Sequence, residues 1–194
     1  MTADNRTARE SGQASPLYVF MVASLLFLAL AFFAVGQAGA ARNGAQTAAD
    51  AAALAAARES RDRLPLSSYL DMDSLTDLFG GELIGPDGCT AGNYYAEQND
   101  AGMQSCVRHF DRWAYTVTVE SRNPVGDTVL PGTESGHAVA TATAVVEPRC
   151  TFEAPDDGDS PTPGSLSCDG DVLELDPTDL PDPSHLFDVR LAED

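Results

Sequence analysis

The hydrophobic residues of this chain are concentrated in one run near its start. No charged residue occurs from residue 11 to residue 41, and residues 17–36 are almost entirely apolar. A helix of about 20 apolar residues spans the hydrocarbon core of a bilayer. The pattern therefore predicts a transmembrane helix over residues 16–38, preceded by a cytoplasmic tail over residues 1–15.

A second run is rich in alanine rather than in larger apolar residues. Residues 46–57 read Gln-Thr-Ala-Ala-Asp-Ala-Ala-Ala-Leu-Ala-Ala-Ala, and alanine has the best helix propensity of all residues. We therefore expect the helix to continue unbroken through an alanine-rich stalk over residues 39–64. Pro65 should end it, because proline lacks the N–H and disfavours helical geometry in the residue before it.

Small residues recur at every fourth position along the helix, which lets helix backbones approach one another closely. In a packed bundle, the one carboxylate among them, Asp50, would need a cation as partner. The candidate helix-packing residues are Gly36, Ala40, Gly44, Ala48, Asp50 and Ala52. The alternative is that alanine merely fills a helix in an alanine-rich proteome.

Alternating apolar and polar residues predict strands in the remainder of the chain, residues 65–194. The alternation covers residues 113–120, 137–147 and 187–191. The first of these strands should turn four side chains toward a core: Trp113, Tyr115, Val117 and Val119.

Two short helices are also expected. Residues 73–79 favour a helix that ends at Gly80-Gly81, because glycine tolerates the positive φ of a helix C-cap. Asn93 is a candidate N-cap for a second helix over residues 94–98.

Two segments are expected to be loops. Residues 123–136 should join two of the strands, and the acidic, proline-rich residues 153–183 should be largely irregular, with an ordered insert at residues 172–175. The expected fold class is α+β: a long N-terminal transmembrane and stalk helix, then a small antiparallel-sheet extracytoplasmic domain with an acidic Pro-rich loop.

The chain has four cysteines, none of them in or before the apolar run. They form two local pairs without a C-x-x-C motif, which makes a zinc ribbon or thioredoxin-type site a poor interpretation. Because short loops close at the lowest entropic cost, we expect disulfides between Cys89 and Cys106 and between Cys150 and Cys168. Disulfides persist outside the reducing cytosol, so the domain should be extracytoplasmic. Four free thiols in a cytosolic domain are the alternative.

The apolar run could be a retained anchor or a signal peptide, since Ala38-Gly39-Ala40 has the form of an A-x-A cleavage site. The run is longer than the usual apolar region of a signal peptide, and the expected helix continues through the site. These features favour a retained, single-pass anchor in the plasma membrane. Its N-terminus should be cytoplasmic, because the cysteines indicate that the domain beyond it is extracytoplasmic.

The chain is strongly acidic beyond the apolar run. Of its 30 acidic residues 28 lie there, against nine of its 11 basic residues, and the whole chain carries a net charge of −19. Nucleic acids and anionic lipid surfaces are therefore poor partners, because the field of the domain repels them.

The N-terminal part of the chain resembles a known family. Gly12-Gln13, the apolar helix, Arg42-Asn43 and residues 46–57 are similar to the N-terminal signature of the TadE/TadG-like proteins of the tight-adherence (Flp-type) pilus system. The similarity covers about residues 11–60. It implies a minor pilin-like or pilus-assembly component of the envelope, with no catalytic activity and with other envelope proteins of the system as partners.

One position departs from the pilin-like members, which are cut after a glycine and have glutamate at the fifth position beyond it. Counted from Gly12, that position is Leu17. The departure favours the membrane-anchored TadG-like type over a polymerising subunit.

No pattern of catalytic or cofactor-binding residues is recognisable. The three histidines belong to no H-E-x-x-H, and there is no G-x-S-x-G, P-loop or G-x-G-x-x-G motif. Ser135-Gly136-His137 has residue types that nucleophilic chemistry uses, but no supporting motif. The acidic turns at residues 156–159 and 169–171 could bind calcium, although neither matches an EF-hand loop. We expect no enzyme activity, no metal and no cofactor.

Three functions therefore remain. The first is a non-enzymatic, membrane-anchored component of a Flp/Tad-type pilus or secretion system, which contacts other envelope proteins or a second copy through its helix. The second is an anchored or secreted acidic binding module, and the third is an anchored hydrolase without a recognisable motif. The helix favours the first, because a binding module has no need for an interacting helix continuous with its anchor.

Overall fold

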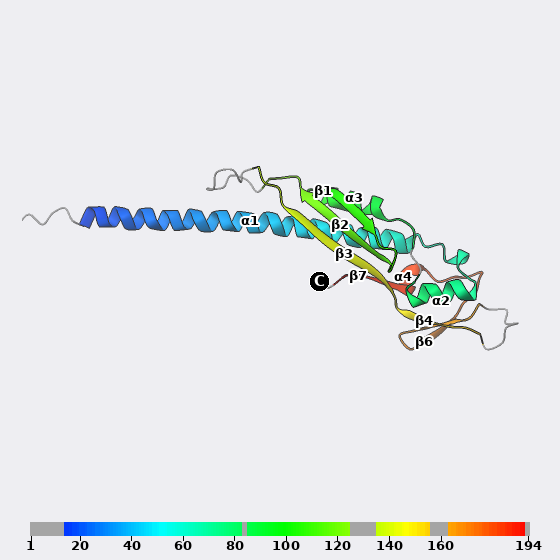
Figure 1. The fold of residues 1–194 in the computed structure, drawn as a ribbon. Helices are drawn as coiled ribbons and strands as arrows, with labels where there is room; N and C mark the ends of the chain where they lie inside the picture. The colour runs from blue at the N-terminus through cyan, green and yellow to red at the C-terminus, as the bar shows by residue number, and fades with distance from the viewer. Residues whose placement is uncertain (1–13, 83–84, 125–134, 156–162, 193–194) are drawn as a thin grey trace, which may run out of the picture.

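The computed structural model describes residues 14–82, 85–124, 135–155 and 163–192. A single helix, α1 (Ala14–Asp62), contains 49 residues and is roughly 70 Å long at 1.5 Å per residue. Its first half projects away from the rest of the molecule and its second half lies along a sheet (Figure 1). The unbroken helix is confirmed. It ends two residues earlier than expected, and Pro65 precedes a short 3₁₀ turn, η1 (Leu66–Ser68).

The larger sheet has four antiparallel strands in the order β1-β2-β3-β7. The expected strands are confirmed as β2 (Ala114–Ser121), β3 (Val139–Pro148) and β7 (Phe187–Leu191). The edge strand β1 (Ala101–Arg108) was missed by the pattern. Its pairing with β2 shifts between Met103 and Ser105, so its alternation is interrupted.

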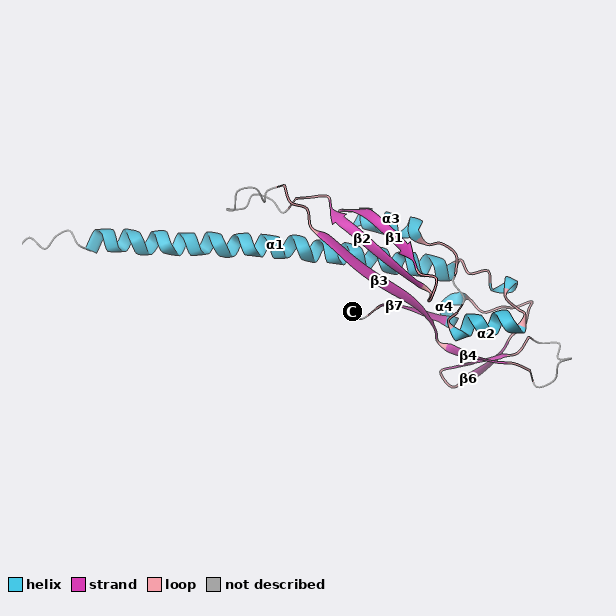
Figure 2. Cartoon of the chain, in the orientation of Figure 1, coloured by secondary structure: helices cyan, strands magenta, loops and turns pink. Residues whose placement is uncertain are grey.

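A smaller sheet of three short antiparallel strands lies at the far end of the domain (Figure 2). It comprises β4 (Cys150–Glu153), β5 (Ser165–Cys168) and β6 (Asp171–Glu174). The ordered insert expected at residues 172–175 corresponds to β6. The described part of residues 153–183 is more regular than expected, because β4 and β5 pair across the Cys150–Cys168 disulfide.

Helix α2 (Met72–Gly80) confirms the first short helix. The Asp71 carboxylate accepts a hydrogen bond from the Ser74 N–H at its start, and Gly81, with φ of 81°, ends it in the left-handed conformation. Helix α3 (Cys89–Gln98) differs from the prediction because it begins at Cys89, after Gly88. Asn93 therefore lies inside α3 and not at its N-cap, and its side chain donates to Glu97. A last turn, α4 (Pro183–Leu186), leads into β7.

The core forms between the second half of α1 and the inner face of the larger sheet. All four side chains predicted to face inward are buried, and they contribute to one hydrophobic cluster with alanines of α1 and β3. Ala49, Ala53 and Ala57 of α1 belong to this cluster, as do Ala142 and Ala144 of β3. The part of α1 expected to be a separate stalk is therefore the central helix of the domain.

Both expected disulfides are present. Cys89 at the start of α3 bonds to Cys106 of β1, and Cys150 of β4 bonds to Cys168 of β5. The described part of the chain has no free cysteine. The first disulfide ties α3 to the edge strand of the larger sheet, and the second joins paired strands of the smaller sheet.

Candidate interaction surface on the long helix

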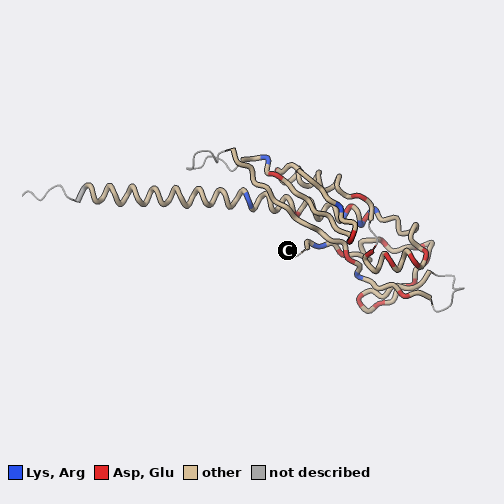
Figure 3. Tube along the Cα trace, viewed as in Figure 1, with Lys and Arg blue, Asp and Glu red and all other residues tan. Residues whose placement is uncertain are grey.

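The first half of α1 is an exposed apolar surface. Leu17, Phe20, Phe27, Phe32 and Val35 are each more than 60% exposed, and this half of the helix carries no charged residue (Figure 3). In the described residues, α1 is long and apolar enough to cross a membrane, and none of its most apolar window is buried against the chain. A soluble protein does not expose such a surface to water, which indicates membrane anchoring.

The row of small residues divides into two parts with different surroundings. Gly36, Ala40 and Gly44 are exposed, whereas Ala48 and Ala52 are fully buried in the chain's own core. Geometry explains the division. Each four-residue step advances the row by about 400°, so the row drifts by about 40° per step around the helix. Its later members have turned inward, which corrects the expectation that Ala48 and Ala52 offer a surface to a partner.

The inward part of the row does make a close helix–helix contact, but within the chain. A Cβ added at Gly92 of α3 would lie 3.0 Å from the carbonyl oxygen of Ala52, and one added at Gly88 would overlap the carbonyl oxygen of Ala56. Gly88 and Gly92 thus form a G-x-x-x-G pair against α1. The spacing of these glycines was the sequence signal for this contact, and our sequence reasoning missed it.

Asp50 has an amide as its partner instead of the expected cation. The Gln46 Nε2 donates to Asp50 Oδ1 at 2.8 Å and lies 3.5 Å from the carbonyl oxygen of Thr141. Gln46 therefore connects α1 to β3, and Asp50 accepts a hydrogen bond from Gln46 on the same helix. This contact gives the polar pair of the alanine-rich segment a structural role in the chain.

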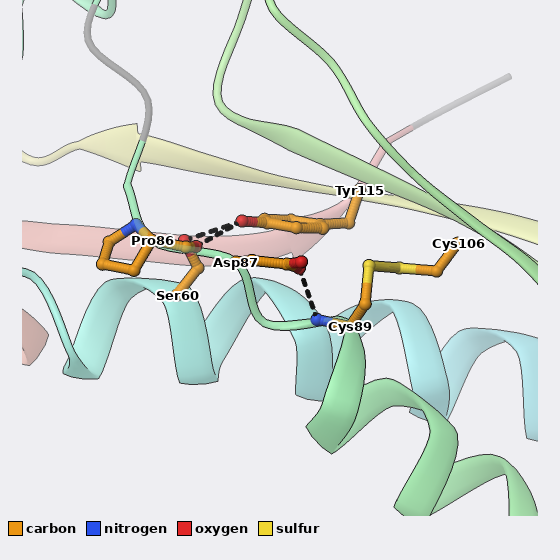
Figure 4. Close-up of a disulfide and its surroundings, with 6 residues drawn as sticks. All are labelled: Ser60, Pro86, Asp87, Cys89, Cys106 and Tyr115. Carbon is orange, nitrogen blue, oxygen red and sulfur yellow. Dashed lines mark hydrogen bonds between the residues drawn. A yellow bond between two sulfur atoms is a disulfide. The ribbon is translucent and has the colours of Figure 1, made fainter.

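A buried hydrogen-bond network fixes the end of α1 against the sheet. Ser60 Oγ lies 2.8 Å from Trp113 Nε1. It also lies 2.9 Å from the Tyr115 hydroxyl, which is 2.6 Å from the carbonyl oxygen of Pro86 (Figure 4). The carbonyl can only accept, so the Tyr115 hydroxyl donates to it, and Ser60 donates to Tyr115 while accepting from the indole. Burial raises the pKa of Tyr115, so its hydroxyl keeps the proton that it donates.

The residues considered for chemistry do not converge on one site. His109 Nε2 contacts the Thr116 hydroxyl, His137 Nδ1 contacts the carbonyl oxygen of Ser121, and His185 lies in α4. In the acidic turn at residues 169–171, Asp169 pairs with Arg149 at 2.7 Å. Residues 156–159 lie outside the described residues. Within the described ranges, no three potential metal ligands are grouped together.

Comparison with known families agrees with the resemblance seen in the sequence. Residues 12–59 match the model of a family described as Tad, putative Flp pilus-assembly TadE/G-like. This segment is TadE/G-like. No curated protein and no solved structure matches the chain. The TadE/G-like segment includes both halves of α1, the exposed apolar half and most of the half that packs in the core.

Proposed function

We propose that this chain is a non-catalytic, membrane-anchored component of a Flp/Tad-type pilus assembly or secretion system. The TadE/G-like match of residues 12–59 is the observation that carries the proposal. The bilayer-length apolar half of α1 supports the anchor. The two disulfides support an extracytoplasmic domain and a cytoplasmic N-terminus.

The outward part of the small-residue row is the surface proposed to contact a partner helix. Among the described residues, no atom outside the helix's own backbone lies within 4 Å of a Cβ built at Gly36 or at Gly44, and Ala40 between them is exposed. The row begins at the end of the apolar run, so a transmembrane helix of another envelope protein could pack backbone to backbone against it. Rigid attachment of the domain to α1 would transmit such a contact to the sheet.

Site-specific photo-crosslinking in the native membrane tests this surface. A small diazirine-bearing side chain replaces Ala40 in one variant and Ala38 in the control. Both positions are exposed, and two helical residues place them about 160° apart around the axis. We expect Ala40 to crosslink to a transmembrane peptide of another protein of the pilus system or of a second copy, and Ala38 to yield mainly lipid adducts.

Two results would contradict the proposal. If both positions yield only lipid adducts, the helix is an anchor alone and the acidic binding module becomes the better interpretation. If the chain is recovered in the soluble fraction without membranes, the anchor itself is wrong.

A further inference from the structure

A cavity of about 410 Å³ lies beside α1 just beyond its apolar half. Its walls come from Gln37, Ala40 and Gly44 on one side, and from Asn99, Asp100 and Ser121 on the other. The volume lies within the range of pockets that hold small ligands. Because residues 17–36 are long enough to span the hydrocarbon, a cavity that begins at Gln37 would lie at the level of the lipid head groups.

The side-chain oxygen of Gln37 is a hydrogen-bond acceptor in this cavity to which no described group donates. Its Oε1 atom is buried and has no hydrogen-bond partner in the described part of the chain. It is also the sole buried side-chain oxygen or nitrogen left unpaired among the described residues. Buried polar atoms in native proteins are almost always paired, so an orphan of this kind indicates a missing partner.

The other polar side chains of the cavity include one carboxylate, from Asp100, and the amides of Asn99 and Asn123. The Asn99 Nδ2 uses one of its two N–H groups to donate to the carbonyl oxygen of Tyr95, and the side-chain oxygen of Asn99 can accept a hydrogen bond. Asp100 supplies an exposed carboxylate, and no arginine is among the described residues that line the cavity. The nearby Arg122 lies 3.8 Å from Glu97. A cation with several N–H donors therefore fits the Asp100 carboxylate and the orphan Gln37 oxygen, whereas a phosphate would meet that carboxylate with no basic side chain among the described lining residues.

We propose that this cavity binds the ammonium group of phosphatidylethanolamine. The inference rests on the proposed membrane anchor, because the lipid reaches the cavity from the leaflet beside it. Ethanolamine carries an ammonium with three N–H donors, whereas the nitrogen of choline is fully methylated and has none. The donor requirement of Gln37 Oε1 therefore separates the two zwitterionic lipids. A bound lipid would lie beside Ala40 and Gly44, so adducts with phosphatidylethanolamine are expected at Ala40 in addition to the protein crosslinks.

Native mass spectrometry of the full-length chain tests the site. The protein is exchanged into an equimolar mixture of phosphatidylethanolamine, phosphatidylcholine and phosphatidylglycerol with identical acyl chains, and the retained adducts are counted. We expect phosphatidylethanolamine to be retained over phosphatidylcholine by between about twofold and tenfold, which corresponds to one net hydrogen bond. Gln37→Leu should abolish this preference, and Asp100→Asn should weaken it.

Gln46→Leu is the matched control, because Gln46 lies on the same helix but bonds to Asp50. It should leave the lipid preference unchanged. Fluorescence of Trp113 should show that each variant is folded. Equal retention of the two zwitterionic lipids, or a preference for phosphatidylglycerol, would overturn the proposal. A chain that fails to float with liposomes would instead contradict the proposed anchor, so the two failures are distinguishable.

Discussion

Replacing Ser60 by alanine removes the acceptor of a buried indole N–H. The Trp113 side chain is 3% exposed, and its Nε1 lies 2.8 Å from Ser60 Oγ, so water cannot replace the lost partner. A buried donor left unsatisfied costs about 1–3 kcal/mol. The higher helix propensity of alanine returns roughly 0.5 kcal/mol. Tyr115 keeps the Pro86 carbonyl as an acceptor, so we expect a net loss of about 1–2 kcal/mol in the free energy of unfolding.

Urea denaturation of the full-length chain in detergent, followed by tryptophan fluorescence, measures this loss. Trp113 is the only tryptophan, so the signal reports the junction of α1 with the sheet. With a denaturant slope of about 2 kcal/mol/M, the middle of the range for small proteins, the midpoint should fall by roughly 0.5–1 M. Ser67→Ala, at an exposed position of η1, should stay within about 0.5 kcal/mol of the parent. A Ser60→Ala midpoint equal to that of the parent would refute the network as a source of stability.

Three further predictions concern the same domain. Gly88→Ala forces a Cβ into the carbonyl of Ala56 and should destabilise the fold by about 1–3 kcal/mol. Gly44→Ala, whose Cβ would meet no atom of another described segment within 4 Å, should not lower the urea midpoint. Non-reducing peptide mapping should find the two disulfides, which close loops of 17 and 18 residues and contribute about 3 kcal/mol each; four alkylatable thiols in native protein would contradict them. The hydrogen bond from the Ser74 N–H lowers the folded-state pKa of Asp71. The stabilisation by the ionised Asp71 carboxylate is therefore complete above the unfolded pKa of about 3.9, and it is lost as the pH falls through the folded-state pKa. Asp71→Asn keeps the cap but cannot titrate, so its urea midpoint should fall less than that of the parent between pH 5 and pH 3, and an identical fall would count against the cap.

Local patterns in the sequence were sufficient to predict an element whose side chains alternate between two faces, or a disulfide whose cysteines are close in the sequence. The strands β2 and β7 alternate without interruption, and both disulfides close short loops. The pattern failed at β1, where the bulge near Gln104 breaks the alternation. It also failed at β4 and β5, whose four residues each are too few to establish a period and which depend on pairing with each other.

The candidate site was predicted only in part, because its geometry depends on contacts that are distant in the sequence. Small residues at four-residue spacing predicted close helix packing, but not that the row turns from solvent at Gly44 to the core at Ala52. The partner of that inward part is α3, whose Gly88 and Gly92 carried a signal that was overlooked. Ser60 reads as an ordinary polar helix residue until the fold brings Trp113, 53 positions later, into contact with it.

Retention of the apolar half of α1 in the mature protein is the condition for every proposed contact of the helix. Intact-mass analysis of protein extracted from membranes tests it directly. The continuous helix through Ala38, Gly39 and Ala40 predicts a mass that still includes residues 17–36, because a peptidase requires an extended substrate at its cleavage site. A species that begins at Ala41 would show that the anchor is a removed signal peptide and would contradict the proposal of a membrane-anchored assembly protein.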